Sequence, residues 1–408
     1  MRDVRRGGGA DRKIRVLHIL DKLGVDGSSV HGVSRAVAWW IGRMDADFET
    51  HVVSLRAVDA AAKFFDAEGI EVEFVSVGRF DPLTVFALLK LIRRWRPDVL
   101  HLHGYGATTF GRLAGFLAGV PRIVHEHFAP DRQAFFITVA DWLLAPLTSY
   151  AIAVSDNVRD YMVRCRKIPP SRLETFFVGL PLDRFRAPDA EALDRLRGEL
   201  GLAPGDRILA NIGRLTDAKR QHLVIEALPA ILEGHPDVHL LIVGDGPAMP
   251  DLAALAERLG VAGHVHLLGY RSDIPALTTL ADIVVMPSYS EGKSIALLEA
   301  MSVGKPIVGT PPVMSDDLLQ AGDFGRVIPI DDVPAIVREV SLLLDDPELA
   351  RRYGETAREI AGDYDLDRSV ARLQSIYRAL VAGELPRPAS RPQRRRAPQP
   401  LPDSSPGG

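Results

Sequence analysis

The chain has 408 residues, of which 47% are hydrophobic and 25% are charged. This composition is typical of a globular protein with about two to three domains. Its formal net charge of -4 gives no general attraction to nucleic acid, so an anionic ligand would have to be held by local cations. The single cysteine, Cys165, excludes an internal disulfide and a zinc site built from several thiolates.

The N-terminal half alternates short apolar runs with helical patterns. Residues 1–12 are charged and glycine-rich, lack the apolar core of a secretory signal, and are expected to be disordered. The strand-like run 14–20 then opens a series of strand and helix patterns that continues to residue 180. This order is typical of βαβ units with a parallel sheet. We therefore predict a Rossmann-like N-terminal domain over 13–180, in a cytoplasmic protein.

A glycine-containing loop over residues 22–32 follows the first predicted strand. Gly24 and Gly27 would let a phosphate or an acceptor approach the backbone closely. The loop lacks the G-x-G-x-x-G spacing of a dinucleotide site, and the next strand ends in Leu55 and Arg56 rather than in an acid. Both features argue against a nicotinamide-dependent dehydrogenase.

A helix predicted over 84–96 has an apolar side and a basic side. Val85, Leu88 and Ile92 share the apolar side. This face would either rest on an anionic membrane, which implies a lipid-linked acceptor, or pack on the N-terminal sheet, which we favour.

The most apolar stretch of the chain, residues 134–154, is interrupted by Asp141 and Pro146. A membrane span needs about 20 consecutive apolar residues with few charges. We therefore expect a buried helix followed by a strand, and no integral membrane segment.

Four histidines lie in pairs on two predicted strands. His101 and His103 share one face of a strand, as do His125 and His127 of the next, so these imidazoles are expected to gather at neighbouring strand ends. Such a cluster would suit a metal-dependent hydrolase. Glu126 points to the opposite face, however, and buried, hydrogen-bonded imidazoles are the other interpretation.

The alternation resumes in the second half of the chain. We predict a linker over 181–204, a second Rossmann-like domain over 205–364, and a helix over 365–384, for which packing back on the N-terminal domain is one option. The stretch 385–408 is rich in proline and arginine and is expected to be disordered. The predicted fold class is α/β, with two Rossmann-like domains facing each other across a cleft.

Two cations and a glycine mark strand ends in the second domain. Arg214 and Lys219 fall between a predicted strand and the following helix, where they would neutralise a diphosphate without a metal ion. Gly244, in the sequence GDGP, would let the backbone approach a ligand at the next strand end.

Glu291 and Glu299 lie eight positions apart across a predicted helix start. If the helix began just after Gly292, the separation along its axis would be about 12 Å. A glycosidase dyad needs about 5 to 9.5 Å between its carboxyl groups, so the spacing favours two grips on one elongated ligand. Free N–H groups at the helix start favour a phosphate between the grips. The residues at this helix start, which are predicted to bind the donor, are Gly292, Lys293, Ser294 and Ile295.

The segment EGKSIALLEAMSVGKPIV, which contains both glutamates, resembles the E-x7-E signature of the retaining family 4 glycosyltransferases of the GT-B fold, also described as glycosyl transferases group 1. Similar segments occur in colinear order: DVLHLHG, IAVSDNVRDYM, GRLTDAKRQHLVIEAL, LLIVGDGP and VHLLGY. The resemblance implies transfer of a sugar from a nucleotide diphosphate sugar to an acceptor, with retention at the anomeric carbon.

The resemblance also implies roles for individual residues. Glu291 would bind the donor sugar, and Glu299 would hold the ribose. Arg214 and Lys219 would clamp the diphosphate, whose departing oxygen would take the acceptor proton. His127 would lie near the anomeric centre and His103 in the cleft. Gly27 and Gly244 would contact the donor, and Gly24 the acceptor. No cofactor, no metal and no nucleic acid partner are expected, and peripheral contact with the inner face of a membrane is an option.

Two other functions stay open. The segment PPVMSDDLL, residues 311–319, replaces the glycine pair and glutamate that are usual in the family, which leaves a non-catalytic nucleotide-sugar-binding protein as an alternative. The histidines leave a metal-dependent hydrolase. The sequence does not specify the sugar, the base, or whether the acceptor is a glycan, a lipid-linked molecule or a small molecule.

Overall fold

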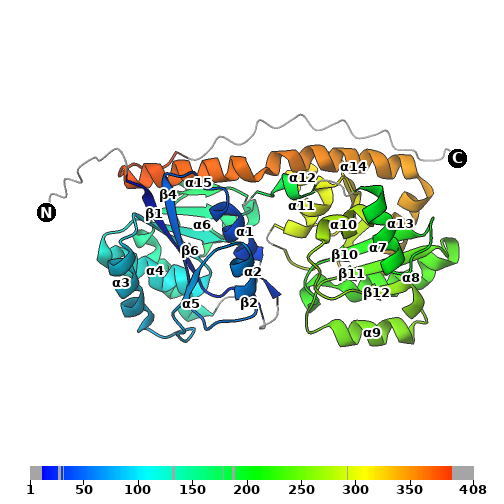
Figure 1. Ribbon diagram of the computed structural model, residues 1–408, viewed down its shortest axis with the longest axis horizontal. Coiled ribbons are helices and arrows are strands. Elements are labelled where there is room, and N and C mark those ends of the chain that lie inside the picture. The colour runs from blue at the N-terminus through cyan, green and yellow to red at the C-terminus, as the bar shows by residue number, and fades with distance from the viewer. Residues whose placement is uncertain are drawn as a thin grey trace. The chain divides into compact units, whose positions relative to one another are not determined.

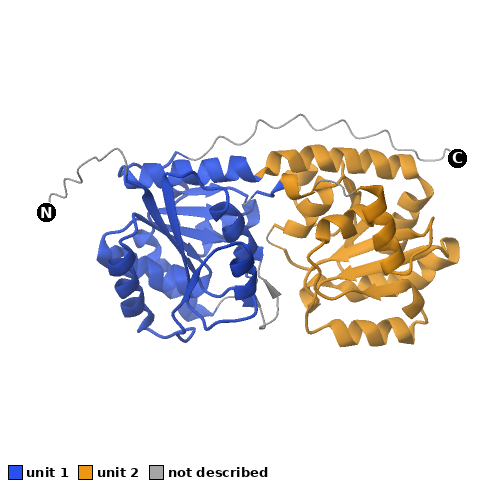
Figure 2. Cartoon of the chain, in the orientation of Figure 1, with its two compact units in different colours: residues 1–181, 366–389 blue, residues 182–365, 390–408 orange. Residues whose placement is uncertain are grey.

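The structure, a computed structural model, describes residues 12–25, 29–30, 32–130, 134–177, 179–185, 189–291 and 293–387. The chain divides into two compact units (Figure 2). Unit 1 comprises residues 1–181 and 366–389, and unit 2 comprises residues 182–365 and 390–408. Gly27 and Gly292 lie outside the described residues, as do segments 1–11 and 388–408, for which the sequence predicts disorder.

Unit 1 is built on a parallel sheet of seven strands among its described residues. Two of its inner strands, residues 99–103 and 150–153, are buried along their whole length, as expected of a sheet covered on both faces. In spatial order the strands are β5 (Val72–Phe74), β4 (Phe48–Ser54), β1 (Ile14–Leu20), β6 (Val99–His103), β7 (Arg122–Glu126), β8 (Tyr150–Ala153) and β9 (Leu173–Thr175). A separate antiparallel pair joins β2 (Gly24–Val25) to β3 (Ser29–Val30).

Helices connect these strands in the predicted βαβ order (Figure 1). They are α1 (Gly32–Ile41), α2 (Ala62–Ala67), α3 (Thr84–Trp95), α4 (Tyr105–Ala118), α5 (Phe135–Leu144) and α6 (Asp156–Arg164). The apolar side of α3 is buried in the core of unit 1 through Val85, Leu88 and Ile92. This confirms the interpretation that the helix predicted over 84–96 packs on the sheet.

The helix α5 corrects a prediction. A helix followed by the strand β8 does occupy the apolar stretch 134–154, but the helix is not buried, because its one fully buried residue is Asp141. The Asp141 carboxylate is turned inward, where it pairs with Arg112 and Arg166. Among the described residues, no helix is both long enough and apolar enough to cross a membrane.

The last helix of the described residues, α15 (Leu366–Val381), packs on unit 1. The Ser369 hydroxyl donates a hydrogen bond of 3.1 Å to the Phe177 carbonyl, and the Leu366 N–H donates one of 3.0 Å to the Leu180 carbonyl. Unit 1 is therefore assembled from two separate parts of the chain. Most of the segment predicted as a linker, 181–204, belongs to unit 2 and contains the helix α7 (Ala190–Glu199).

Unit 2 repeats the design with a parallel sheet of six strands among its described residues. In spatial order these are β12 (Val265–Leu267), β11 (Val238–Val243), β10 (Arg207–Ile212), β13 (Ile283–Met286), β14 (Ile307–Gly309) and β15 (Gly325–Val327). Its other helices are α8 (Gln221–Gly234), α9 (Met249–Arg258), α10 (Ile274–Leu280), α11 (Ile295–Ser302), α12 (Asp316–Leu319), α13 (Val333–Asp345) and α14 (Pro347–Ala361). The two Rossmann-like folds that the sequence predicts are confirmed.

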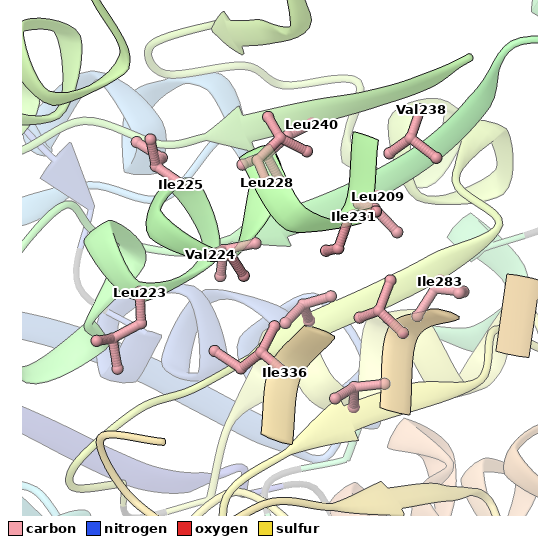
Figure 3. Packing of buried hydrophobic residues seen from close by; sticks show 14 of the residues in the cluster. Leu209, Leu223, Val224, Ile225, Leu228, Ile231, Val238, Leu240, Ile283 and Ile336 are labelled. Atoms are coloured by element: carbon pink, nitrogen blue, oxygen red, sulfur yellow. The ribbon is translucent and has the colours of Figure 1, made fainter. Parts of the chain in front are cut away.

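The core of unit 2 lies between its sheet and the helices α8 and α13. Figure 3 shows Val224, Leu228 and Ile231 of α8 with Leu209 and Leu240 of the strands, in one apolar layer. All five are fully buried. This packing fixes the start of α8, and with it the loop that precedes the helix.

Each sheet has one point where the strand order reverses. In unit 1 it falls between β1 and β6, and in unit 2 between β10 and β13. The loops that leave the carboxyl ends of these strands diverge there, which is where open parallel sheets bind their ligands. Most of the candidate residues lie at the ends of these four strands, whereas His127 follows β7 and Gly244 follows β11.

Candidate functional site

The reversal point of unit 2 is bordered by close backbone contacts. The Gly213 N–H donates to the Val243 carbonyl at 2.9 Å, and the Gly244 N–H donates to the Gly269 carbonyl at 2.9 Å. Gly244 has a φ of 143°, and a Cβ atom placed there would collide with the Gly213 carbonyl oxygen. A side chain at position 244 would therefore separate the ends of β10 and β11, which is a physical reason for the glycine in GDGP.

Lys219 and Glu291, two predicted site residues 72 positions apart, form an ion pair at this edge. The Ser288 hydroxyl, at the end of β13, donates a further hydrogen bond of 3.1 Å to Glu291 Oε1. The Tyr289 N–H donates to the Ala218 carbonyl at 2.8 Å, which ties the loop after β13 to the loop after β10. The structure thus brings one predicted cation and one predicted carboxylate together.

Arg214 lies directly after Gly213, five positions before Lys219, and is half-buried. Its carbonyl accepts a hydrogen bond of 2.9 Å from the Gln221 side-chain amide. Within the described part of the chain no carboxylate forms an ion pair with the Arg214 guanidinium. A half-buried cation that no described carboxylate neutralises is suited to an anionic ligand.

The helix α11 begins at Ile295, two residues later than the assumed start at Lys293. The Ser294 hydroxyl caps it by accepting a hydrogen bond of 3.4 Å from the Leu297 N–H. Glu299 is therefore only the fifth residue of the helix, so the axial distance calculated for eight helical residues does not apply. Glu299 is 1% exposed. A hydrogen bond to its carboxylate would be strengthened by the low polarity of this buried setting.

The side chain of Lys293 pairs with Asp317 of α12, and binding of the donor at Lys293 stays a prediction. Burial opposes ionisation of Asp317, but the Lys293 ammonium outweighs it and holds the pKa of Asp317 below its ordinary value. Asp317 belongs to the segment 311–319 that departs from the family pattern. The sequence carries no signal for this pair, because its two members are 24 positions apart.

Five imidazoles form two hydrogen-bonded chains on one face of the sheet of unit 1. His18 Nδ1 lies 3.3 Å from His103 Nε2, and His103 Nδ1 lies 3.1 Å from His127 Nε2. His101 Nε2 lies 3.0 Å from His125 Nδ1. The predicted gathering of the four histidines is confirmed. The fifth, His18, was detectable in the sequence, because β1 neighbours β6 in such sheets and His18 pairs with His101 in register.

Two helices cover this histidine cluster. Tyr377 of α15 lies with its hydroxyl 2.7 Å from His101 Nδ1, and Trp40 of α1 stacks on His125 at 5.3 Å between ring centroids. Burial in this apolar setting lowers the pKa of His101, His103 and His125 well below the ordinary value, and lowers the pKa of His18 to about 3. The buried imidazoles are therefore neutral at physiological pH.

Among the described residues, two sets of three histidines have nitrogen atoms within 4.8 Å of one another and could hold a metal ion: His18 with His101 and His103, and His103 with His125 and His127. A hydrolytic metal centre also needs a carboxylate or a water position. Glu126 lies on the opposite face of β7, where Arg166 Nη2 is 2.6 Å from its carboxylate. This arrangement supports the interpretation of buried, mutually hydrogen-bonded imidazoles.

We expect the free energy of unfolding to fall as the pH is lowered from about 7.5 to about 5.5. Unfolded imidazoles take up protons near pH 6.5, whereas His18 stays neutral in the folded chain down to about pH 3. Stability is therefore complete above the unfolded pKa, and each such imidazole removes about 1.4 kcal/mol per pH unit below it. Urea unfolding at both pH values measures the slope, and His18→Asn should make it shallower. Equal unfolding free energies at both pH values would contradict the expectation.

Gly24, the predicted acceptor contact, lies in β2 after the carboxyl end of β1. Its N–H donates a hydrogen bond of 3.0 Å to the Asp59 carboxylate, which fixes the backbone there. Beside it Asp21 pairs with Arg56, and a Cβ atom at Gly104 would lie 2.9 Å from the Asp21 Cβ. The reversal point of unit 1 is therefore narrow and polar at β1 and lined by histidine at β6.

Comparison with known proteins identifies the class. The profile of the family described as glycosyl transferases group 1 matches residues 194–360, and that of glycosyltransferase family 4 matches residues 30–184. Alpha-D-kanosaminyltransferase of Streptomyces kanamyceticus is 31% identical over 337 residues, which cover 77% of this chain and 86% of that protein. The UDP-Gal:alpha-D-GlcNAc-diphosphoundecaprenol alpha-1,3-galactosyltransferase of Escherichia coli is 27% identical over 315 residues, or 74% of this chain and 81% of that protein.

A solved structure shares the fold. The crystal structure of HepE from Anabaena in complex with UDP and glucose has a TM-score of 0.78 at 21% identity, and the match covers 88% of this chain and 98% of that one. Fold and relatives together define a nucleotide-sugar-dependent glycosyltransferase of the GT-B type. The chain belongs to glycosyltransferase family 4, the glycosyl transferases group 1, as the sequence predicts.

Proposed function

We propose that this glycosyltransferase transfers its sugar with retention of configuration and without a metal ion, and that unit 2 holds the nucleotide sugar. Arg214 and Lys219 bind the diphosphate, Glu291 binds the sugar hydroxyls, and Glu299 accepts hydrogen bonds from the ribose. The carrying observation is that the half-buried Arg214 guanidinium forms no ion pair among the described residues. The backbone at Gly244 and the first turn of α11, with Ser294 and Ile295, complete the donor site.

The proposed step takes place on one face of the sugar. The bond between the anomeric carbon and the departing phosphate oxygen breaks, and that oxygen takes the proton of the acceptor hydroxyl. The acceptor oxygen then bonds to the anomeric carbon on the face that the phosphate leaves. Arg214 and Lys219 stabilise the charge that grows on the nucleoside diphosphate. His127 and His103 are proposed to contact the reacting sugar and the acceptor.

The ion pair of Lys219 with Glu291 gives this site a way to respond to the donor. In this ion pair each side chain neutralises the other. A diphosphate competes for the Lys219 ammonium, which releases the Glu291 carboxylate toward the sugar hydroxyls. Binding of the donor would thus prepare the carboxylate for the transfer step.

We propose that the acceptor belongs to one of three classes: a glycan, a lipid-linked molecule or a small molecule. The name of the E. coli relative includes a diphosphoundecaprenol acceptor, which supports the lipid-linked class. A cytoplasmic location with peripheral contact at the inner face of a membrane would accompany that class. The helix α3, which first suggested such a contact, has its apolar side buried in the core of unit 1.

A thermal-shift screen of nucleotide sugars followed by transfer assays tests the proposal. A donor at about 100 times its Kd should add about 2.7 kcal/mol of stability. Turnover of the donor separates an active transferase from a protein that only binds the donor. The stereochemistry of the product, read by NMR at the anomeric proton, separates retention from inversion.

We expect transfer to survive treatment with EDTA, because the diphosphate charge is met by Arg214, Lys219 and backbone N–H groups. The assay compares initial rates with and without chelator, alongside elemental analysis of the purified protein. Loss of transfer that is restored by Mn²⁺ or Zn²⁺ would reject metal independence and direct attention to the histidine cluster.

A further inference from the structure

The helix α5 presents its apolar side chains to the outside. Phe135 is 82% exposed, Phe136 56%, Trp142 60% and Leu143 63%. The last three of these positions follow Phe135 by one, seven and eight residues, so all four side chains lie on one side of the helix. The opposite side carries Asp141, the one fully buried residue of α5.

Asp141 keeps the helix in this orientation. Its carboxylate pairs with the Arg112 guanidinium of α4, and Arg166 Nε lies 3.5 Å from Asp141 Oδ2. All three side chains are at most 5% exposed. A rotation of α5 that buried its phenylalanines would separate this ion pair and leave the two arginines without it, which is strongly unfavourable in an apolar interior. The apolar side is therefore held outward.

The apolar surface continues on the neighbouring elements. On α4, Phe116 is 54% exposed and Leu117 60%, whereas Arg112, the one charged residue of that helix, is buried. Phe80, before α3, is 52% exposed and contacts the Phe136 ring at 5.7 Å. We call the outward residues of the two helices the α4–α5 face: Phe116, Leu117, Phe135, Phe136, Trp142 and Leu143. Neither helix carries an outward charge. Six exposed apolar side chains on two neighbouring helices are more than the singly scattered apolar residues usual on a protein surface.

Cations accompany this apolar region on the side of α3. The Arg79 guanidinium lies 5.3 Å from the centroid of the Phe80 ring. On α3 and just before it, the exposed positions 83, 86, 90 and 93 follow the helical repeat. They run from Leu83 and Phe86 to Lys90 and Arg93. An apolar surface bordered by basic side chains matches the charge of an anionic lipid surface.

We infer that the α4–α5 face docks on a membrane that contains anionic lipid. A protein partner of ordinary kind would need about one hydrogen bond per 100 to 200 Å² of interface, and of the six side chains only the Trp142 indole can form one. Phenylalanine, leucine and an interfacial tryptophan suit the boundary between acyl chains and head groups instead. The inference rests on the surface of unit 1 alone and is independent of the donor site in unit 2.

Sedimentation with vesicles tests the inference on the full chain. One vesicle preparation is phosphatidylcholine and the other contains phosphatidylglycerol as well. We expect binding to the anionic vesicles that is weakened by salt, and a Kd raised about tenfold or more by the double change Phe136→Ser with Trp142→Ser. Tyr270→Ser in unit 2, at a position that is 59% exposed, is the matched control and should bind as the wild type does.

Thermal melting shows whether each variant is folded, and Phe135→Ser with Leu143→Ser is a second pair should the first not fold. Absence of binding to anionic vesicles, or equal binding by both α4–α5 face variants and the wild type, would overturn the inference. Sedimentation velocity without lipid tests the remaining alternative, in which a second copy of the chain occupies the α4–α5 face. A dimer that the variants convert to a monomer would show that a second copy of the chain covers this face, and would also overturn it.

Discussion

Replacing both Arg214 and Lys219 with alanine is expected to lower kcat far more than it weakens binding of the donor. Negative charge on the departing diphosphate grows toward the transition state, so preorganised cations are worth more there than in the ground state. One donor of this kind contributes about 3 to 4 kcal/mol, or roughly 10² to 10³ in kcat. Loss of both should therefore reduce kcat by at least about 10⁴-fold if their effects add.

Steady-state kinetics and nucleoside diphosphate binding, measured on the same variant, separate the two effects. Arg207→Ala is the matched control, because Arg207 lies at the opposite end of β10 and pairs with Asp237. It removes one cation from the same sheet without touching the site. If the double variant of Arg214 and Lys219 keeps the wild-type kcat and only its KM rises, the two cations stabilise the bound donor and the transition state equally. The proposed mechanism would then be wrong.

The second large effect is expected from the two glutamates, which should respond differently to one ligand. Glu299→Ala should weaken the nucleotide sugar and the free nucleoside diphosphate alike, because both contain the ribose. A hydrogen bond to a charged group contributes about 1.5 to 3 kcal/mol, so the loss should be roughly 10- to 150-fold. Glu291→Ala should mainly impair transfer and leave nucleoside diphosphate binding nearly intact. It also frees the Lys219 ammonium from its ion pair.

Calorimetry with nucleoside diphosphate decides between the roles. Because Glu299 is buried, Glu299→Gln serves as the variant that keeps the shape of the side chain, and Glu339→Gln is a control at a buried acid on α13. Glu339 accepts a hydrogen bond of 2.6 Å from Arg326, away from the site residues in sequence. Equal losses at Glu291 and Glu299, or a loss at Glu291 alone, would reject the assignment of ribose to Glu299.

The fold was predictable because its signals are local and repeated. Strands such as β1 and β8 read as mainly apolar runs, and helices such as α8 read as amphipathic repeats, so the βαβ order and both Rossmann-like sheets follow from the sequence. The orientation of α5 did not follow. Its hydrophobicity predicts burial, but the pair of Asp141 with Arg112 turns the apolar side outward, and a pairing across 29 positions leaves no periodic signal.

The candidate site was predictable in part for a similar reason. Lys219 and Glu291 both follow strand ends, and topology brings strand ends together, so their meeting is a consequence of the sheet order. The contact between Lys293 and Asp317 depends on the course of a loop, which sequence spacing does not encode. The late start of α11 depends on the cap that Ser294 provides, whereas a glycine is the stronger helix-boundary signal in this segment.

The return of α15 to unit 1 affects the order in which the chain can fold during synthesis. Residues 182–365 are continuous, so unit 2 has all of these residues once Asp365 has left the ribosome. Unit 1, although it is made first, still lacks Tyr377, whose hydroxyl reaches His101 in its interior. A nascent chain thus exposes the whole of segment 182–365 before it can finish unit 1, and the first sheet stays uncovered along α15 until residues 366–381 have also emerged. A premature stop between these points would leave the earlier-made unit unfinished, although segment 182–365 of the later-made unit would be complete.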